Sequence, residues 1–265
     1  MNTNIVLCNS DLIMYLSDYL NDNDSFHLFT VNKTLNNIII NNKHKYKVKS
    51  IINEKEAKTN IYNYKIQKYI CYSIKKLPQS LTSLTFVNYF NRPVDNLPQS
   101  LTSLTFGYMF NQPVDNLPES LTSLTFGFDY DKLVDNLPQS LTSLTFGHYY
   151  NQPVDNLPQS LTSLTFGYHF NQPVDNLPQS LTSLTFGSDF NRPVDNLPHS
   201  LTRLTFGYMF NRSVDNLPQS LTSLTFGHYY QHDIPNLINL KILYINNKYN
   251  KDLHFDKEVK IHRYD

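Results

Sequence analysis

Apolar and polar positions alternate over short segments that recur every twenty residues along most of the chain. Residues 103–106 read Ser-Leu-Thr-Phe, so Leu104 and Phe106 face one side of an extended backbone while the polar residues face the other. A run of this kind, with β-branched and aromatic residues, predicts a short β-strand with its apolar side in a core. Pro98 and Pro113 disfavour helix in the rest of the unit, because a residue before proline is pushed to extended backbone.

The heptapeptide Leu-Pro-Gln-Ser-Leu-Thr-Ser begins at Leu77 and recurs, sometimes with substitutions, every twenty residues. Eight units fill residues 77–236, and a degenerate ninth unit follows them. A short fixed period is typical of a solenoid, in which each unit buries its apolar side against its neighbours. Strands stacked about 4.8 Å apart predict a body roughly 40 Å long. We expect the glycine after each strand to adopt a positive φ in a turn.

Two polar columns accompany the apolar ones. We expect the amide column to bond the backbone of the next coil rather than to act in catalysis. Its members are Asn91, Asn111, Asn151, Asn171, Asn191 and Asn211, with Asp131 and Gln231 as exceptions. The aspartates from Asp95 to Asp215 are expected to close the Val-Asp-Asn-Leu-Pro turn, since the glycine pairs of calcium-binding β-rolls are absent from the sequence.

The repeated phrases Phe-Asn-Gln-Pro-Val, at residues 110–114 and 170–174, and Leu-Pro-Gln-Ser-Leu-Thr-Ser-Leu-Thr-Phe-Gly carry a family resemblance. They resemble the FNIP repeat, a relative of the leucine-rich repeat that is abundant in social amoebae and in giant DNA viruses of amoebae. The resemblance implies a mainly β, leucine-rich-repeat-like solenoid that serves as a binding scaffold and is not an enzyme.

The N-terminal stretch predicts two amphipathic helices, separated by the turn Asn-Asp-Asn-Asp at residues 21–24. The order of apolar residues is similar to an F-box, which implies docking on the Skp adaptor of a cullin-type ubiquitin ligase. The alternative is a helical pair that only caps the solenoid. Under the F-box interpretation the adaptor-binding residues are Leu12, Leu16, Leu20, Phe26, Leu28, Val31 and Leu35.

These patterns divide the chain into four parts. Residues 1–45 form the F-box-like helical domain, 46–76 a basic connecting segment, 77–236 the eight repeats, and 237–265 a degenerate repeat with a C-terminal cap. We expect the connecting segment to form a helix or a strand pair with buried isoleucines and solvated lysines. Its lysines and tyrosines also suit nucleic acid, but the solvated interpretation is preferred and no nucleic-acid partner is expected.

The formal net charge of zero hides an uneven distribution. Residues 1–76 carry eleven lysines against six acidic residues, whereas residues 77–236 carry five basic residues against twelve acidic ones. Residues 237–265 carry six basic residues against four acidic ones. A basic N-terminal segment, residues 1–76, therefore precedes an acidic repeat region.

Target recognition must use positions that differ among the units, because identical units present identical surfaces. The variation concentrates after the strand, in pairs such as Tyr-Met and His-Tyr, which are interface-type residues; drift between recent duplicates is the alternative. Arg203 replaces an outward serine, and it lies near Arg192 and Arg212 only if the coil is narrow, in which case the three arginines suggest an anion site. The target-binding candidates are Tyr108, Met109, Phe128, Asp129, His148, Tyr149, Tyr168, His169, Arg203, Tyr208 and Met209.

Catalysis has little support in the sequence. No Ser-His-Asp grouping or phosphate loop is visible, and His148 and His228 lie four units apart. Cys8 and Cys71 lack metal-site spacing, so no metal or cofactor is expected. Two lone thiols and the lack of a long apolar run favour an intracellular protein without a membrane partner, in the host cytoplasm if the viral resemblance holds.

Overall fold

The computed structural model describes residues 4–8, 26–30, 48–52, 69–71, 77 and 79–265. Four short strands precede the repeats: β1 (Asn4–Cys8), β2 (Phe26–Thr30), β3 (Val48–Ile52) and β4 (Tyr69–Cys71). The repeat strands are β5 (Ser83–Phe86), β6 (Ser103–Thr105), β7 (Ser123–Thr125), β8 (Ser143–Thr145), β9 (Ser163–Thr165), β10 (Ser183–Thr185), β11 (Arg203–Thr205) and β12 (Ser223–Thr225). The C-terminal strands are β13 (Ile242–Asn246) and β14 (Lys260–Tyr264).

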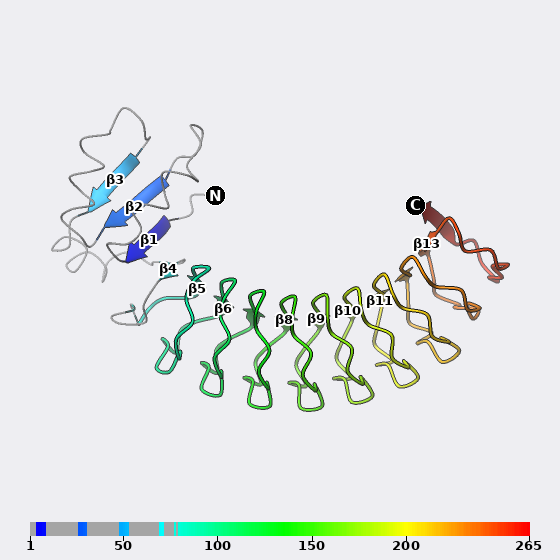
Figure 1. Cartoon of the computed structure of the whole chain (residues 1–265), viewed down its shortest axis with the longest axis horizontal. Coiled ribbons are helices and arrows are strands. Elements are labelled where there is room, and N and C mark those ends of the chain that lie inside the picture. The colour runs from blue at the N-terminus through cyan, green and yellow to red at the C-terminus, as the bar shows by residue number, and fades with distance from the viewer. Residues whose placement is uncertain (1–3, 9–25, 31–47, 53–68, 72–76, 78) are drawn as a thin grey trace.

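All described strands join one parallel sheet, in the order β14-β13-β12-β11-β10-β9-β8-β7-β6-β5-β4-β1-β2-β3. Equivalent residues of successive repeats lie side by side, as Leu104 does with Leu124. The coils form a curved row with the repeat strands along its inner side (Figure 1). The fold is therefore a mainly β, parallel solenoid, as the twenty-residue period predicts.

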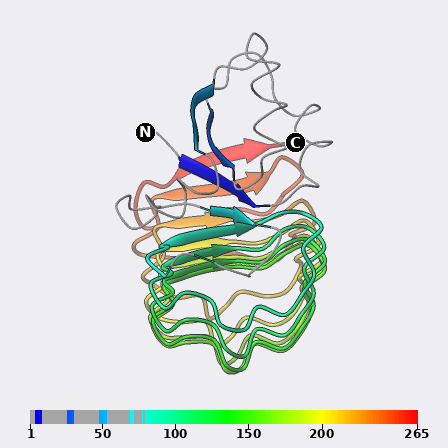
Figure 2. The same cartoon turned by 90° about the vertical axis from the view of Figure 1, so that its left-hand side faces the viewer.

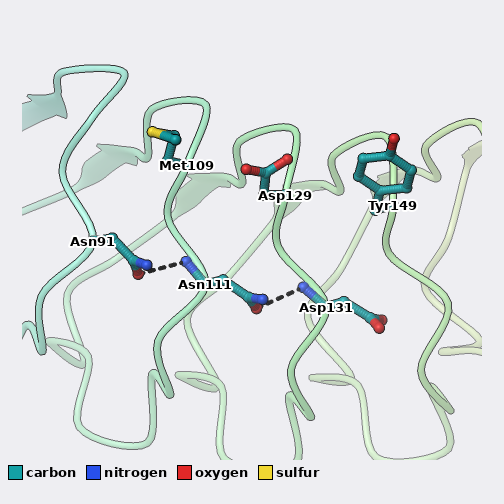
Figure 3. A pocket seen from close by; sticks show the side chains of 6 residues that line it. All are labelled: Asn91, Met109, Asn111, Asp129, Asp131 and Tyr149. Carbon is teal, nitrogen blue, oxygen red and sulfur yellow. Dashed lines mark hydrogen bonds between the residues drawn. The ribbon is translucent and has the colours of Figure 1, made fainter.

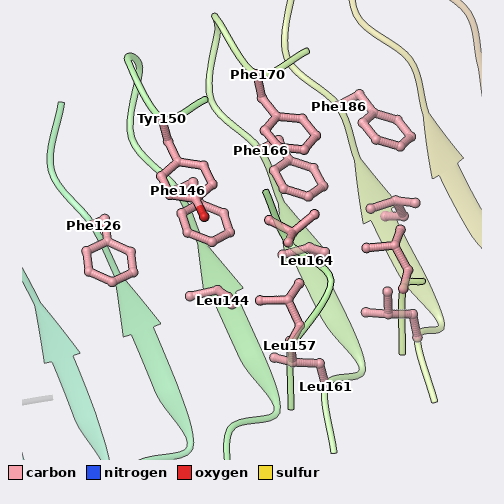
Figure 4. Close-up of a cluster of buried hydrophobic side chains, with 14 of the residues drawn as sticks. Phe126, Leu144, Phe146, Tyr150, Leu157, Leu161, Leu164, Phe166, Phe170 and Phe186 are labelled. Carbon is pink, nitrogen blue, oxygen red and sulfur yellow. The ribbon is translucent and has the colours of Figure 1, made fainter. Parts of the chain in front are cut away.

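Leucine and aromatic columns fill the interior of each coil, as the strand pattern predicts. Leu104 and Phe106 are buried, while Ser103 and Thr105 are only half-buried. Phe106 lies 3.7 Å from Phe110 of its own coil and 5.7 Å from Phe126 of the next, measured between ring centroids. The side chains of successive coils thus form columns along the solenoid (Figure 4). Viewed along the row, the successive coils overlap in outline (Figure 2).

The amide column bonds the next coil, which confirms the sequence prediction. Asn91 Oδ1 accepts a hydrogen bond from the backbone N–H of Asn111 at 3.0 Å, and Asn111 Oδ1 accepts from the N–H of Asp131 at 3.0 Å. The pattern continues to Gln231, whose N–H donates to Asn211 Oδ1. Each side chain therefore satisfies a backbone donor that the short strands leave without a ladder partner.

The aspartate column lies at the turns, as expected, and it also connects neighbouring coils. Asn156 Nδ2 donates to Asp135 Oδ1 at 3.1 Å, and Asn176 Nδ2 donates to Asp155 Oδ1 at 3.0 Å. The turn is thus held to the next turn by an amide–carboxylate bond. The sequence pattern did not reveal this second role.

The glycine column has a different cause from the one predicted. None of the described glycines has a positive φ, and Asn96 is the described residue that does, at 65°. A β-carbon on Gly127, for example, would stand 1.8 Å from the carbonyl oxygen of Gly107 in the preceding coil. Close stacking of backbone on backbone, rather than a left-handed turn, therefore requires glycine here. Val87 occupies the first position of the column, and its carbonyl oxygen is the atom that a β-carbon on Gly107 would meet.

The N-terminal helix prediction is wrong for Phe26 and Leu28. Residues Phe26–Thr30 form strand β2, which pairs in parallel with β1 and β3. Phenylalanine and threonine favour strands, and the neighbouring strands supply backbone hydrogen-bond partners, whereas an isolated short helix is only marginally stable. The other predicted adaptor-binding residues lie outside the described residues: Leu12, Leu16, Leu20, Val31 and Leu35.

The described part of the basic connecting segment is extended. Strands β3 and β4 lie within it, but they do not pair with each other: β3 pairs with β2, and β4 pairs with β1 and β5. The strand pair predicted for this segment is therefore wrong in its pairing. The four-part division of the chain stays a prediction.

The degenerate ninth unit continues the solenoid through β13, and β14 adds a further strand beside it. Arg263 Nη1 donates to the carbonyl oxygen of Tyr249 at 3.0 Å, and the hydroxyl of Tyr264 donates to the carbonyl of Phe226. These bonds tie the C-terminal residues to the last coils. Across the described ranges, no helix has the length and apolar character needed to cross a membrane.

Candidate binding surface

The variable residue pairs lie in the turns that follow the repeat strands. Met109 N–H donates to the carbonyl of Asn88 at 2.8 Å, and Asp129 N–H donates to that of Tyr108 at 2.9 Å. Similar bonds hold the next tips together, such as that from His169 N–H to His148 O at 2.9 Å. The tips therefore form a row with a fixed backbone, and only their side chains differ.

The first residues of these pairs form a column of stacked rings. Ring centroids are 4.4 Å apart between Tyr108 and Phe128, 4.2 Å between Phe128 and His148, and 4.8 Å between His148 and Tyr168. Ser188 interrupts the column. We call Tyr108, Phe128, His148 and Tyr168 the ring column, and it brings four predicted target-binding residues into one continuous surface.

His148 is held tightly within the ring column. Its ring is sandwiched between those of Phe128 and Tyr168, and its Nδ1 is buried without a hydrogen-bond partner among the described residues. Packing of the ring, rather than polar bonding at Nδ1, therefore fixes this side chain.

The second residues of the pairs form a more mixed column. Tyr149 lies parallel to His169, with centroids 5.2 Å apart, and nearly perpendicular to Phe128. His169 Nδ1 lies 2.7 Å from Asp189 Oδ2, so a carboxylate ends this stretch of rings. Six predicted target-binding residues thus meet across adjacent coils, because Tyr149 and His169 also contact the ring column through His148.

An open pocket of about 580 Å³ lies between the loop tips and the amide column. The tips contribute Met109, Asp129 and Tyr149, each from a successive coil (Figure 3). The amide column contributes Asn91, Asn111 and Asp131. The sequence predicts only a structural role for these last three residues, because a periodicity does not reveal that two columns border one hollow.

The remaining predicted residues lie elsewhere on the solenoid. Tyr208 and Met209 occupy the tip after β11, where Tyr208 stacks on His228 at 5.0 Å. Arg203 is exposed on strand β11, whereas Arg192 and Arg212 use Nε to bond the carbonyls of Asn171 and Asn191. Both of these arginines are therefore occupied with holding neighbouring coils together.

The largest increases in pKa occur at buried tyrosines of the core, although desolvation also raises the pKa of Tyr208 at a loop tip. Burial, followed by the charges of Asp115 and Asp131, raises the pKa of Tyr130 well above its usual value. Burial likewise raises the pKa of Tyr150 and Tyr230. Within the described residues, no group of three or more histidine, cysteine or acidic side chains is arranged to hold a metal ion. The loop-tip surface therefore presents aromatic rings and carboxylates on a fixed backbone, an arrangement that suits contact with another molecule.

Comparison with known proteins agrees with this architecture. The FNIP Repeat family model matches residues 73–109, 90–129, 110–149, 128–169, 150–189, 170–209 and 190–229. A search of curated proteins gives no match. The chain is also similar to CroV588, whose crystal structure is described as a novel circular LRR protein structure, with 37% identity and a TM-score of 0.60.

The likeness to CroV588 covers 74% of this chain but only 36% of that protein. The chain thus matches little more than a third of the length of its structural neighbour. Matches to the family model run from residue 73 to residue 229, which is more than half of the sequence. This chain therefore belongs to the FNIP repeat family and folds as a leucine-rich-repeat-like solenoid of the kind suited to protein–protein interaction.

Proposed function

We propose that the chain is the substrate-recognition subunit of a cullin-type ubiquitin ligase: the solenoid captures a target protein on its loop tips, and the N-terminal segment binds the Skp adaptor. The observation that supports target capture is the ring column, where two exposed rings, Tyr108 and Tyr168, and two half-buried ones occupy positions that vary among units. Aromatic side chains on a fixed backbone are typical of interfaces, because they bury much area at little cost in conformational entropy.

The adaptor half of the proposal depends on the resemblance of residues 11–38 to an F-box. Strand β2 at Phe26–Thr30 departs from the helix expected there. The proposal therefore rests on Leu12, Leu16 and Leu20 for adaptor contact, together with a location in the cytoplasm. The second candidate is a scaffold that captures the target without adaptor binding, which the strand at Phe26–Thr30 favours.

Target capture is tested by affinity purification with the full chain from a eukaryotic lysate, followed by mass spectrometry. We expect a reproducible partner that is lost from Tyr108→Ser/Tyr168→Ser. Serine occurs at the equivalent position 188, so the loop tip accepts it without disturbing the coil. The exposed turn variant Gln139→Ala is the control and should retain the partner. Equal recovery with both variants contradicts capture by the ring column.

Adaptor binding is tested in the same lysate by immunoblotting for the Skp adaptor and cullin. We expect recovery of both with the full chain and loss of both from Leu16→Ala/Leu20→Ala. Failure to recover the adaptor, or unchanged recovery with the double variant, rejects the ligase assignment. Retention of the target partner under that outcome supports the scaffold.

A further inference from the structure

We infer that the pocket between Met109, Asp129 and Tyr149 receives an arginine or lysine side chain from an extended basic segment of the target. This inference deepens the proposed function and rests on it. It names the chemistry of the partner and the coils that select it.

Two carboxylates of the same coil border the pocket. The Asp129 side chain is half-buried and has no hydrogen-bond or ion-pair partner among the described residues. Asp131 Oδ1 accepts bonds from Asn151 N–H at 3.0 Å and Gln152 Nε2 at 2.9 Å, which leaves its second oxygen available. A guanidinium group offers several donors in a fixed plane and thus suits a pocket that is lined by an unpaired carboxylate and a partly paired one.

Tyr149 supplies a ring beside these carboxylates. Its side chain is 49% exposed, yet it is held by perpendicular contacts to Phe128 and His148 and a parallel contact to His169. Figure 3 shows its ring at the loop tip, in the same row as Asp129 and Met109. A cation near a tyrosine face is attracted by the ring, and the nearby carboxylates add to that attraction.

Charge across the repeat region favours a basic occupant. Residues 77–236 carry twelve acidic residues against five basic ones, and Arg192 and Arg212 are committed to backbone carbonyls. Nucleic acid would meet this negative charge with its own phosphates and is disfavoured. The amide groups of Asn91 and Asn111 at the pocket wall also suit the backbone carbonyls of an extended peptide.

The chain contains an internal comparison for this site. Tyr229 follows a histidine, as Tyr149 does, and is also 49% exposed. It lies perpendicular to Tyr208 and His228, much as Tyr149 lies to Phe128 and His148. However, Met209 and Asn211 stand where the earlier coil has Asp129 and Asp131. The two sites therefore share the ring and differ in the carboxylates.

The test measures binding of labelled peptides to the full chain by fluorescence anisotropy at low ionic strength. The probe is Gly-Ser-Arg-Ser-Arg-Ser-Gly, compared with the same peptide carrying citrulline, a neutral isostere, in place of arginine. We expect the arginine peptide to bind and the citrulline peptide not to bind. Asp129→Asn/Asp131→Asn should weaken binding of the arginine peptide about tenfold, as expected for losing charge-assisted hydrogen bonds. Asparagine at 131 restores the residue found in most units, so the coil should fold normally.

The matched control is Asp135→Asn/Asp155→Asn, which removes the same charge from turns that do not border the pocket. It should change the affinity less than about twofold, since exposed and distant charges are screened. Tyr149→Ala should weaken binding and Tyr229→Ala should not. Equal losses in the two aspartate pairs, or equal binding of the citrulline peptide, overturn the inference.

The two proposals fail in different ways. If no arginine peptide binds but Tyr108→Ser/Tyr168→Ser still releases the captured target, the inference is wrong and target capture stands. If the arginine peptide binds through Asp129 and Asp131 while Tyr108→Ser/Tyr168→Ser keeps its target, capture by the ring column is wrong. The inference that the pocket receives a basic side chain then stands.

Discussion

The carbonyl oxygen of Gly127 lies 1.6 Å from the point where a β-carbon on Gly147 would stand. A separation this short is far inside van der Waals contact, so no side chain fits at this point of the coil. The two turns consequently approach each other more closely than a residue with a β-carbon at position 147 would allow.

Gly147→Ala should lower the free energy of unfolding by about 3 kcal/mol, because backbone atoms of two coils must separate to admit the methyl group. Chemical denaturation followed by circular dichroism measures the change. Ser188→Ala, in a neighbouring loop tip, should stay within about 0.5 kcal/mol. A neutral or stabilising Gly147→Ala would instead fit a glycine that serves only chain flexibility.

Phe146→Ala should destabilise the chain by about 3–5 kcal/mol, since it empties a buried position between two stacked rings. The ring centroid of Phe146 lies 5.6 Å from those of Phe126 and Phe166. The same denaturation experiment measures the loss. Tyr149→Ala removes an exposed ring of the same unit and should cost much less; a loss below about 1 kcal/mol for Phe146→Ala would contradict stacking inside the core.

Asn151→Ala should cost about 1–3 kcal/mol, because it leaves the N–H of Asn171 without its acceptor. Asn151→Asp keeps an oxygen in place and should cost less. Asp131 already performs this role toward Asn151 at 3.0 Å. Thermal unfolding of the two variants side by side provides the measurement, and equal destabilisation would show that the side-chain oxygen is not the relevant group.

Stability should fall as pH rises above about 10, the ordinary pKa of tyrosine. Burial raises the pKa of Tyr130, Tyr150 and Tyr230 in the folded chain, so they keep their protons there while the unfolded chain loses them. Their contribution is therefore complete below pH 10 and declines above it. The urea midpoints at pH 9 and pH 11 should differ less in the triple variant Tyr130→Phe/Tyr150→Phe/Tyr230→Phe than in the unaltered chain. An equal pH effect in that variant would assign the decline to other groups.

Much of the fold follows from the period and from the identity of a few columns. Leu104 and Phe106 predict an inward-facing strand, and Asn111 predicts a side chain that bonds the next coil, because a fixed period places each residue beside its own copy. The same logic places Tyr108, Phe128 and His148 in one column. Their stacking follows once the coils pair without a register shift.

What the sequence did not reveal depends on distances between columns. The cause of the glycine column is a close approach of two backbones, which spacing along one chain does not contain. The pocket beside Asp129 requires that two different columns border the same hollow. The apolar pattern around Phe26 and Leu28 covers so few residues that it fits a helix or a strand, and pairing with strand β1 decides for the strand.

In-register pairing of near-identical coils has a consequence for how such a surface changes over generations. Loss of residues 157–176 would join Asn156 to Leu177, and each new neighbour would present the same leucine, phenylalanine and asparagine contacts as the old one. The solenoid would lose one coil and keep its interior, yet the order of rings and carboxylates at the tips would be rearranged in a single step. Gene duplication and deletion in whole units can thus reshuffle what the chain recognises while leaving its folding rules untouched.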